Sequence, residues 1–192
     1  IFFQRFARGA QALTILCGAV SFAAATILLL QGGEATQSFR AVWLQSGTFQ
    51  LEFGFLLDPA SRMMGVVVAL ITLCVEVYSL GYMAHDPSKT RYFALLGFFE
   101  WSMLSLVYAL NLAQLFIFWE MVGLASFFLI GFWFEKPAAA APAKKAMLMT
   151  RVGDIGFFIG MALLLRETAT IDIPKILDPT GGLLAAIPTG RM

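Results

Sequence analysis

Three glutamates interrupt apolar runs of this sequence, at positions where a carboxylate is unfavourable. Glu76, Glu100 and Glu120 each lie inside a run of aliphatic and aromatic residues. A charged group at the centre of a membrane helix costs about 2.5–3.5 kcal/mol on insertion scales, and such groups generally mark ion or proton pathways. Burial also disfavours the charged form of a carboxyl group, which favours proton exchange near neutral pH. The three glutamates are therefore candidate proton sites; the alternative is that each one only joins helices through a hydrogen bond.

Arg151 and Asp154 are the second candidate set, because residues three apart share one face of a helix. They could form a local ion pair near the membrane edge, or they could control where Glu120 finds its counter-charge. If their helix begins near residue 146, a rise of about 1.5 Å per residue places Arg151 only several Å inside the membrane. Glu120 lies nearer the middle. We therefore expect no direct contact between Arg151 and Glu120, and we expect the chain to lack a cation for Glu120.

Other reactive residues give weaker signals. Lys144 and Lys145 are possible additional proton sites, whereas His85 lies in a polar loop. The sequence has no phosphate-binding glycine loop and no CxxC or Cys/His cluster, so we expect neither a metal nor another cofactor in this chain. Its net charge of +1 gives no basic field for nucleic acid.

The elements that must position these residues follow from composition. The chain is 59% hydrophobic and only 13% charged, which indicates a membrane protein. We predict an all-α, polytopic transmembrane helix bundle of about five spans. The expected spans lie near 9–31, 64–83, 92–110, 112–134 and 146–166. The third and fourth must form a helical hairpin that turns near Asn111.

The segments between the spans divide the chain into four parts. Residues 1–31 hold the first span, and 32–63 form a linker in which alternation in "FQLEFGF" after Ser46-Gly47 predicts a β-hairpin outside the membrane. Residues 64–166 hold the remaining spans, connected through "EKPAAAAPAKKA", which is either a loop or a short surface helix. Residues 167–192 are polar and do not form a sixth span; we expect them to lead to missing downstream helices. The Gly156–Gly160 spacing predicts close helix packing.

Lysines and arginines of the loops predict the orientation of the chain. The richer side carries Arg5, Arg8, Lys89, Arg91, Lys136, Lys144 and Lys145. This side should face the cytoplasm or matrix, so the β-hairpin should face the opposite compartment.

Several segments resemble a known family. They are "FLLDPASRMM", "YSLGYMAHDPSKTRYFALLGFF", "FWEMVGLASFFLIGFWFEKPAAAAPAKKA" and "TRVGDIGFFIGMALL". They are similar to the largest antiporter-like membrane subunit of respiratory complex I, the subunit L or chain 5 family. Relatives of that subunit occur in multi-subunit Na⁺/H⁺ antiporters and membrane-bound hydrogenases.

The resemblance implies roles for residues. Glu120 matches the family's proton-handling glutamate, and Arg151 with Asp154 matches its "N-R-x-G-D" motif, with Thr150 in place of the usual Asn. The family's glutamate pairs with a lysine on a later helix, which would lie beyond these residues. Glu76 stands where relatives often have histidine, and Glu100 where Asn or an apolar residue is expected. Leu110 replaces a frequent Asp.

The leading hypothesis is thus an N-terminal fragment of the proton-translocating arm of an NADH:quinone oxidoreductase, in a bacterial inner membrane or an organelle equivalent. NADH, FMN, iron–sulfur clusters and quinone would bind other subunits. The expected partners are other membrane-arm subunits, lipid, and a chain or segment that supplies the downstream helices. The alternatives are a subunit of an Na⁺/H⁺ antiporter or hydrogenase of the same family, or a structural remnant.

Overall fold

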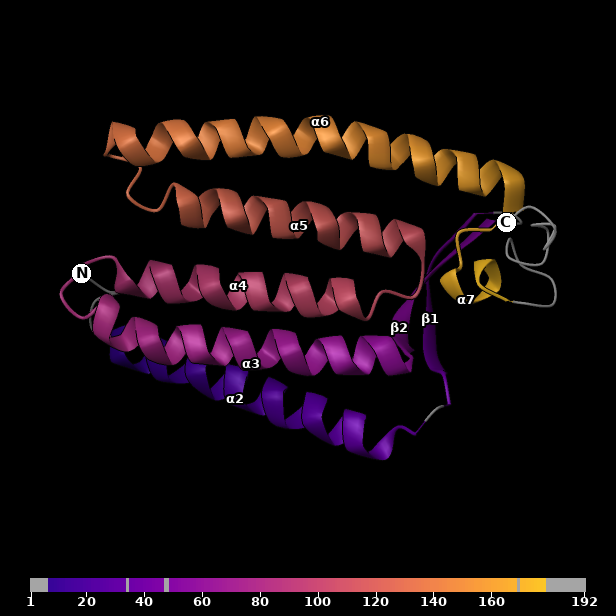
Figure 1. Ribbon diagram of the computed structural model, residues 1–192, viewed down its shortest axis with the longest axis horizontal. Coiled ribbons are helices and arrows are strands. Elements are labelled where there is room, and N and C mark those ends of the chain that lie inside the picture. Colours follow the sequence, from indigo (N-terminus) through magenta and orange to yellow (C-terminus); the bar gives the residue numbers. More distant parts are fainter. Residues whose placement is uncertain (1–6, 34, 47–48, 169, 179–192) are drawn as a thin grey trace, which may run out of the picture.

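Five long helices run side by side and form an elongated bundle (Figure 1). The computed structural model describes residues 7–33, 35–46, 49–168 and 170–178. The long helices are α2 (Ala7–Gln31), α3 (Pro59–Tyr82), α4 (Lys89–Val107), α5 (Leu112–Ile130) and α6 (Pro137–Thr168). The all-α bundle with one small β-hairpin is confirmed.

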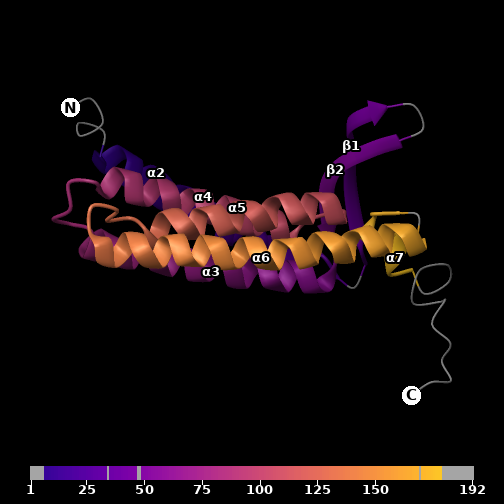
Figure 2. The same ribbon diagram turned by 90° about the horizontal axis from the view of Figure 1, so that it is seen from above.

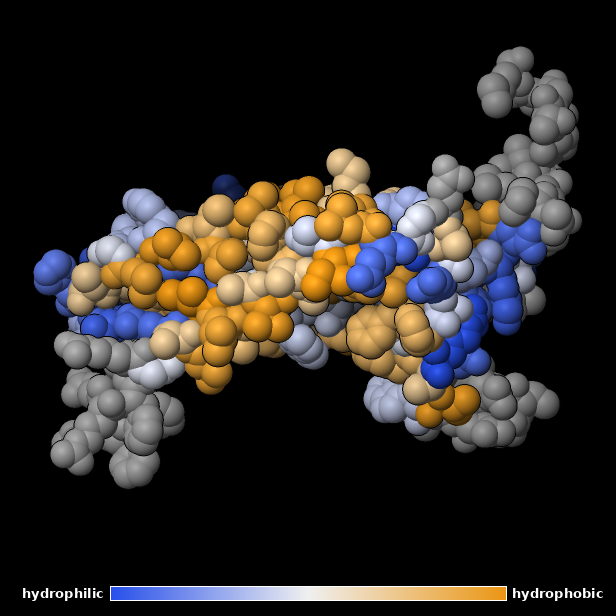
Figure 3. All heavy atoms as spheres, turned by 90° about the horizontal axis from the view of Figure 1, so that it is seen from below, coloured by the Kyte–Doolittle hydropathy of each residue, from blue (hydrophilic) through white to orange (hydrophobic). Residues whose placement is uncertain are grey.

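Four of these helices, all except α4, are long and apolar enough to cross a membrane. Helix α4 falls short of this criterion because it carries Lys89 and Arg91 in its first turn and Glu100 near its middle. Large hydrophobic side chains are exposed on every long helix, and in Figure 3 they cover the middle of the visible face while hydrophilic residues gather toward the ends. This outward apolar surface is what a lipid-facing bundle requires.

The helices are not packed equally. Helices α2, α3 and α4 all contact one another, α5 packs on α4, and α6 packs on α5 (Figure 1). The α3–α4 and α5–α6 connections lie at one end of the bundle, and the β-hairpin, the α4–α5 turn and α7 (Ile173–Ile176) lie at the other (Figure 1). The bundle therefore has two distinct buried regions, one inside α2–α4 and one between α5 and α6.

Side-chain caps fix the starts of two helices at the hairpin end. Asp58 caps α3 by accepting from the Ser61 amide at 2.6 Å, and the Ser61 hydroxyl accepts from the Asp58 amide at 3.0 Å. Asn111 caps α5 by accepting from the Gln114 amide at 2.8 Å. The turn predicted near Asn111 is confirmed. Helix α3 begins at Pro59, five residues earlier than the predicted span, because this capping box starts it there.

The β-hairpin consists of β1 (Gln37–Ser46) and β2 (Phe49–Leu57), paired antiparallel with an irregularity between Val42 and Leu44. At this end of the bundle it stands out to one side of the helices (Figure 2). Gly54 is buried against α5, where its amide donates to Gln114 at 3.2 Å and its carbonyl accepts from the same side chain at 2.9 Å. A Cβ at Gly54 would collide with the backbone of the paired strand, so a glycine is needed for this approach.

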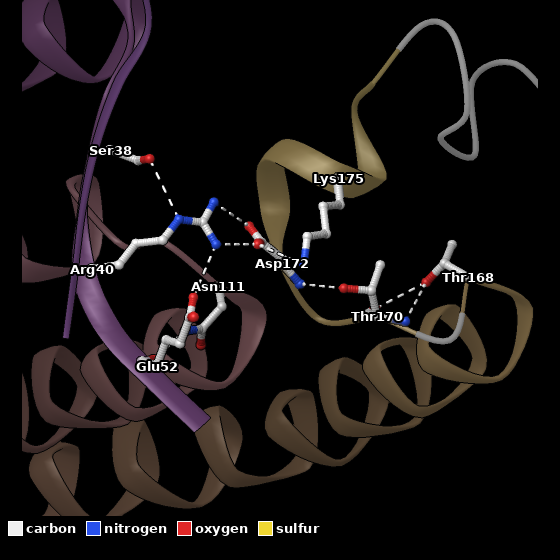
Figure 4. Close-up of polar contacts among 8 residues, drawn as sticks. All are labelled: Ser38, Arg40, Glu52, Asn111, Thr168, Thr170, Asp172 and Lys175. Carbon is white, nitrogen blue, oxygen red and sulfur yellow. Dashed lines mark hydrogen bonds and ion pairs between the residues drawn. The ribbon is translucent and has the colours of Figure 1, made fainter. Parts of the chain in front are cut away.

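A polar cluster joins the hairpin to the segment after α6 (Figure 4). Arg40 of β1 lies 2.9 Å from Glu52 of β2 and 2.5 Å from Asp172, and Lys175 lies 3.6 Å from the same aspartate. The Asn111 side-chain amide donates to the Glu52 carbonyl at 2.7 Å. Asp172 holds the pKa of the Arg40 guanidinium above its ordinary value, with Glu52 adding to the effect. The cluster therefore links the hairpin, the α4–α5 turn and α7 at one end.

Helix α6 is longer than predicted. It begins at Pro137 and includes the "AAAAPAKKA" segment, so the region that could have been a loop or a separate surface helix is the first part of α6. Pro142 lies inside this helix. At the other end α6 extends to Thr168, and residues 179–192 of the predicted tail lie outside the described residues.

Candidate functional site

Glu120 and Arg151 lie at a similar level on neighbouring helices. Arg151 is 14 residues beyond Pro137, which places it about 21 Å along α6 at about 1.5 Å per residue. Glu120 lies 8 residues from the start of α5 at Leu112, so it is about 12 Å from the hairpin end. Helices α5 and α6 run antiparallel and pack together, so both side chains fall near the middle of the bundle.

Arg151 forms an ion pair with Glu120. The prediction that these side chains do not touch was wrong, and so was the expectation that the chain lacks a cation for Glu120. The error came from the start of the helix, because a helix that begins at Pro137 carries Arg151 much deeper than one that begins near 146. The side chain of Glu120 retains 20% of its exposure, so the pair is partly buried.

Arg151 also faces a second carboxylate. Its Nη1 atom lies 3.6 Å from Asp154 Oδ2, one turn further along the same helix. The Trp119 indole of α5 donates to Asp154 Oδ1 at 3.0 Å, and the Asp154 side chain is only 10% exposed. One guanidinium is therefore shared by two carboxylates, and the second carboxylate is held in place by a neutral donor.

A groove of about 460 Å³ surrounds these groups between α5 and α6. Its walls include Trp119 and Phe157, whose rings stack at 6.1 Å. The ring of Phe116, also from α5, stacks on Phe157 with a distance of 5.6 Å between the ring centroids. Aromatic walls lower the local dielectric constant, so each change of charge pairing is worth more here than in water.

The set can exchange one cation between two anions. When Arg151 pairs with Glu120, the ionised form of Glu120 is favoured, because an opposite charge stabilises a carboxylate. When Arg151 turns to Asp154, Glu120 loses its counter-charge in an apolar groove, and taking up a proton becomes favourable. Arginine suits this role because its guanidinium stays charged and presents several donors in a fixed plane. The geometry thus places one permanent cation beside two carboxylates, one of which is held by Trp119.

The structure separates the other predicted site residues from this pair. Glu76 and Glu100 lie inside α2–α4 and are 0% and 4% exposed. Lys144 and Lys145 are exposed on α6, and Lys144 is about 10 Å along the helix from Arg151. The structure therefore brings together Glu120, Arg151 and Asp154 but leaves these two lysines outside the site.

Trp119 is the site residue that sequence reasoning missed. The sequence drew the prediction to the neighbouring Glu120. The available signal for Trp119 is that an indole N–H in an apolar helix also needs a hydrogen-bond partner. Close packing at the GxxxG glycines stays a prediction, because no other described element comes within 4 Å of a Cβ at Gly156 or Gly160. Among the described residues there is also no group of three or more His, Cys, Asp or Glu that could hold a metal.

Two family models match the chain. Residues 43–93 match the N-terminal region of chain 5 of NADH–ubiquinone oxidoreductase (complex I). Residues 109–186 match the transmembrane region shared by NADH:quinone oxidoreductases and Mrp antiporters. The chain therefore belongs to the family of antiporter-like membrane subunits that includes chain 5 of complex I.

Curated relatives of this chain include subunits of NAD(P)H-quinone oxidoreductases. NAD(P)H-quinone oxidoreductase chain 5 of Synechocystis sp. is 42% identical over 154 residues, which is 80% of this chain and 23% of that protein. The chloroplastic subunit 5 of Coffea arabica is 46% identical over 119 residues, which is 62% of this chain and 16% of that protein. The chain thus spans about a quarter or less of the length of these relatives.

Solved structures show the same fold. The Mrp complex from Dietzia sp. DQ12-45-1b contains a chain that matches 96% of this one with a TM-score of 0.75 and 26% identity, over 21% of its own length. An archaeal membrane-bound sulfane sulfur reductase matches 88% of this chain with a TM-score of 0.69 and 14% identity, over 36% of its own length. The second likeness concerns the fold alone.

Proposed function

We propose that this chain forms part of a proton half-channel in the membrane arm of an NAD(P)H–quinone oxidoreductase, with Glu120 as the proton-carrying carboxylate. The observation that carries the proposal is the sharing of Arg151 between Glu120 and Asp154 inside an apolar groove. The names of the relatives support this type of complex over the other members of the family.

In this proposal electron transfer occurs in other subunits. NAD(P)H, flavin, iron–sulfur clusters and quinone bind there, and this chain contributes no redox centre. A change of charge that arrives from neighbouring membrane helices moves Arg151 from Glu120 to Asp154, and Glu120 then takes up a proton. When Arg151 returns, the ionised form of Glu120 is favoured again and the proton leaves. The partners are other membrane-arm subunits and the helices that follow in longer relatives, and the location is a bacterial inner membrane or an organelle equivalent.

The test replaces Glu120 in the assembled complex. Glu120→Gln keeps the shape of the side chain but cannot release a proton, so proton translocation during donor oxidation should be lost or strongly reduced. Donor oxidation in the presence of an uncoupler should persist, because no redox centre is touched. Glu167→Gln is the matched control, because its side chain is 62% exposed near the end of α6. Wild-type proton translocation in Glu120→Gln would refute the proposal.

A second candidate function is Na⁺/H⁺ exchange within a multi-subunit antiporter. The specific support is the structural likeness to a chain of the Mrp complex, at a TM-score of 0.75. This function predicts that an Na⁺ gradient changes the internal pH of sealed membrane vesicles that contain the protein, without any electron donor. Proton movement that needs a donor and ignores Na⁺ would favour the oxidoreductase.

A further inference from the structure

Two carboxyl groups outside the Arg151 site are buried inside the α2–α4 cluster. Glu76 of α3 is 0% exposed and Glu100 of α4 is 4% exposed. Helices α2, α3 and α4 all contact one another, and Ser21 of α2, one turn from Gly18, lines the same groove as Glu100. Helix α2 covers the carboxyl groups closely, because a Cβ at Gly18 would collide with the Glu76 carboxyl group. Packing of three helices therefore creates a second acidic centre.

These carboxyl groups have few hydrogen-bond donors. Both oxygens of Glu76 and the Oε1 atom of Glu100 are buried without a hydrogen-bond partner among the described residues. The Ser21 hydroxyl of α2 is a nearby donor, because Ser21 and Glu100 line the same groove. An ionised carboxylate needs several donors to be stable when buried. The two groups together therefore lack what two negative charges would require.

In the part that the structure describes, helices α2 and α3 also offer no basic side chain near Glu76 or Glu100. Residues 9–31 of α2 contain no charged residue, and the weakly acidic Cys17 is the ionisable side chain there. On α3 the cation is Arg62, about 21 Å along the helix from Glu76. Its guanidinium already donates to the carbonyl groups of Gly32, Gly33 and Ala35.

The neighbouring helices offer no better cation. On α4 the basic residue nearest to Glu100 is Arg91, about 13 Å along the helix, and it donates to the Phe132 carbonyl at 2.8 Å. The only charged residue of α5 is Glu120, which pairs with Arg151. Tyr92 and Tyr108, at either end of α4, can share protons but carry no positive charge at neutral pH. Among the described residues, no cation therefore reaches either carboxyl group. Two buried carboxylates without a cation cannot both stay ionised, so one of them is expected to hold a proton.

Buried hydroxyl groups lead from the pair toward the lysine- and arginine-rich end. Ser79 is 0% exposed and lies one turn from Glu76 on the same face of α3. Its hydroxyl is 3.4 Å from the hydroxyl of Tyr92, which is half-buried near the start of α4. On the other side, Glu100 lines a groove of about 530 Å³ that also includes Ser21, Ser105 and Tyr108. The Ser79 hydroxyl donates to the Val75 carbonyl at 2.7 Å in this structure, so it must rotate before it can pass a proton between Glu76 and Tyr92.

We propose that the buried carboxyl groups of Glu76 and Glu100 form a second proton-binding site, which holds at least one proton and exchanges it with the lysine- and arginine-rich end past Ser79 and Tyr92. The use of this site in transport rests on the proposed function, whereas its protonated state rests only on burial and on the absence of a counter-charge. The site is separate from Glu120 because it is built from α2, α3 and α4 instead of α5 and α6.

Infrared spectroscopy of the purified complex that contains this chain tests the proposal. A protonated carboxyl group has a carbonyl band that is distinct from a carboxylate band and shifts in D₂O. At neutral pH, Glu76→Gln and Glu100→Gln should each remove or shift such a band, whereas Glu120→Gln and the exposed control Glu167→Gln should leave it in place. Ser79→Ala should keep the band and slow its shift in D₂O.

Three outcomes overturn the proposal. The first is a set of carboxyl bands that is the same in wild type, Glu76→Gln and Glu100→Gln. The second is loss of the band on adding Na⁺ at constant pH, which would show a metal cation in place of the proton. The third is failure of both glutamine variants to assemble, because glutamine matches a protonated glutamate in shape and charge. Proton translocation that survives Glu120→Gln would contradict the proposed function but would leave this test intact.

Discussion

Arg151 is the residue on which the proposed proton site depends. Its guanidinium contacts Glu120, and the second carboxylate, Asp154, lies 3.6 Å from the same nitrogen. A lysine at this position would offer one compact charge, whereas arginine can keep a hydrogen bond to one carboxylate while approaching the other. The tryptophan bound to Asp154 keeps that carboxylate within reach. In the proposed function, Arg151 would therefore change partners with a small side-chain movement.

Asp86, in the loop between α3 and α4, provides a pH prediction outside the membrane. The Trp133 indole donates to its carboxylate at 2.9 Å and the Ser88 amide at 2.7 Å. These bonds, with Arg91 and Lys136 nearby, hold the pKa of Asp86 below its ordinary value. Because the folded-state pKa is depressed, the stabilising contribution is present above the ordinary carboxyl pKa and is lost as the pH falls through the lowered value.

The emission of Trp133 should report this titration. In a protein whose Trp43, Trp101 and Trp119 are replaced by Phe, lowering the pH should change the fluorescence with a midpoint below the ordinary pKa of an aspartate. Asp86→Asn should abolish the transition. An unchanged transition in Asp86→Asn, or a midpoint at or above the ordinary value, would contradict the assigned contact.

Helix α6 shows why some of the site could be predicted from the sequence and some could not. The spacing of Arg151 and Asp154 indicated one helix face, and the isolation of Glu120 indicated function. The contact between Glu120 and Arg151 was not foreseen, because two prolines in "EKPAAAAPAKKA" suggested an interruption. Pro137 instead occupies the first helical position, where its missing N–H costs nothing, and the alanines that follow favour a helix. Nine additional helical residues before 146 move Arg151 to the level of Glu120.

The β-hairpin should depend on Arg40 more than on Glu52. Arg40→Gln removes the cation that joins both carboxylates and leaves Asp172, which is 12% exposed, with the single cation Lys175. We expect a loss of about 1–2 kcal/mol in hairpin docking, since the bonds are charged but partly solvated. Glu52→Gln should cost less than about 1 kcal/mol, because Arg40 keeps Asp172.

Hydrogen exchange of the hairpin amides measures this difference. Faster exchange at β1 and β2 in Arg40→Gln than in Glu52→Gln would agree with the expected order. Equal exchange in both variants and wild type would show that strand pairing and Gln114 hold the hairpin without the cluster in Figure 4.

At the scale of the whole molecule, the chain has two ends of different character and two acidic centres. The sequence predicted the ends, because loop charge and the β-hairpin pattern are local features. It did not predict that Glu76 and Glu100 are buried in the same three-helix cluster, because the contacts among α2, α3 and α4 are decided by packing. Gly18 illustrates this point: its lack of a side chain matters only because α3 presents Glu76 at that position.

The two ends should lie on opposite sides of the membrane. In a variant lacking Cys17 and Cys74, His85→Cys should react with a membrane-impermeant maleimide from the cytoplasmic or matrix side. Thr36→Cys, before β1, should react only from the opposite side. Both positions are exposed, so access should be limited by the membrane alone. Labelling of both cysteines from the same side of sealed vesicles would contradict the orientation.

Partner exchange by Arg151 is tested most directly by neutralising the second partner. In Asp154→Asn, Glu120 and Arg151 are both intact, but Arg151 has lost the alternative carboxylate and should stay on Glu120. The protons translocated per donor oxidised should therefore fall strongly, while donor oxidation with an uncoupler continues. If Asp154→Asn translocates protons at the wild-type ratio, the Glu120–Arg151 pair is a static bridge and the proposed exchange is wrong.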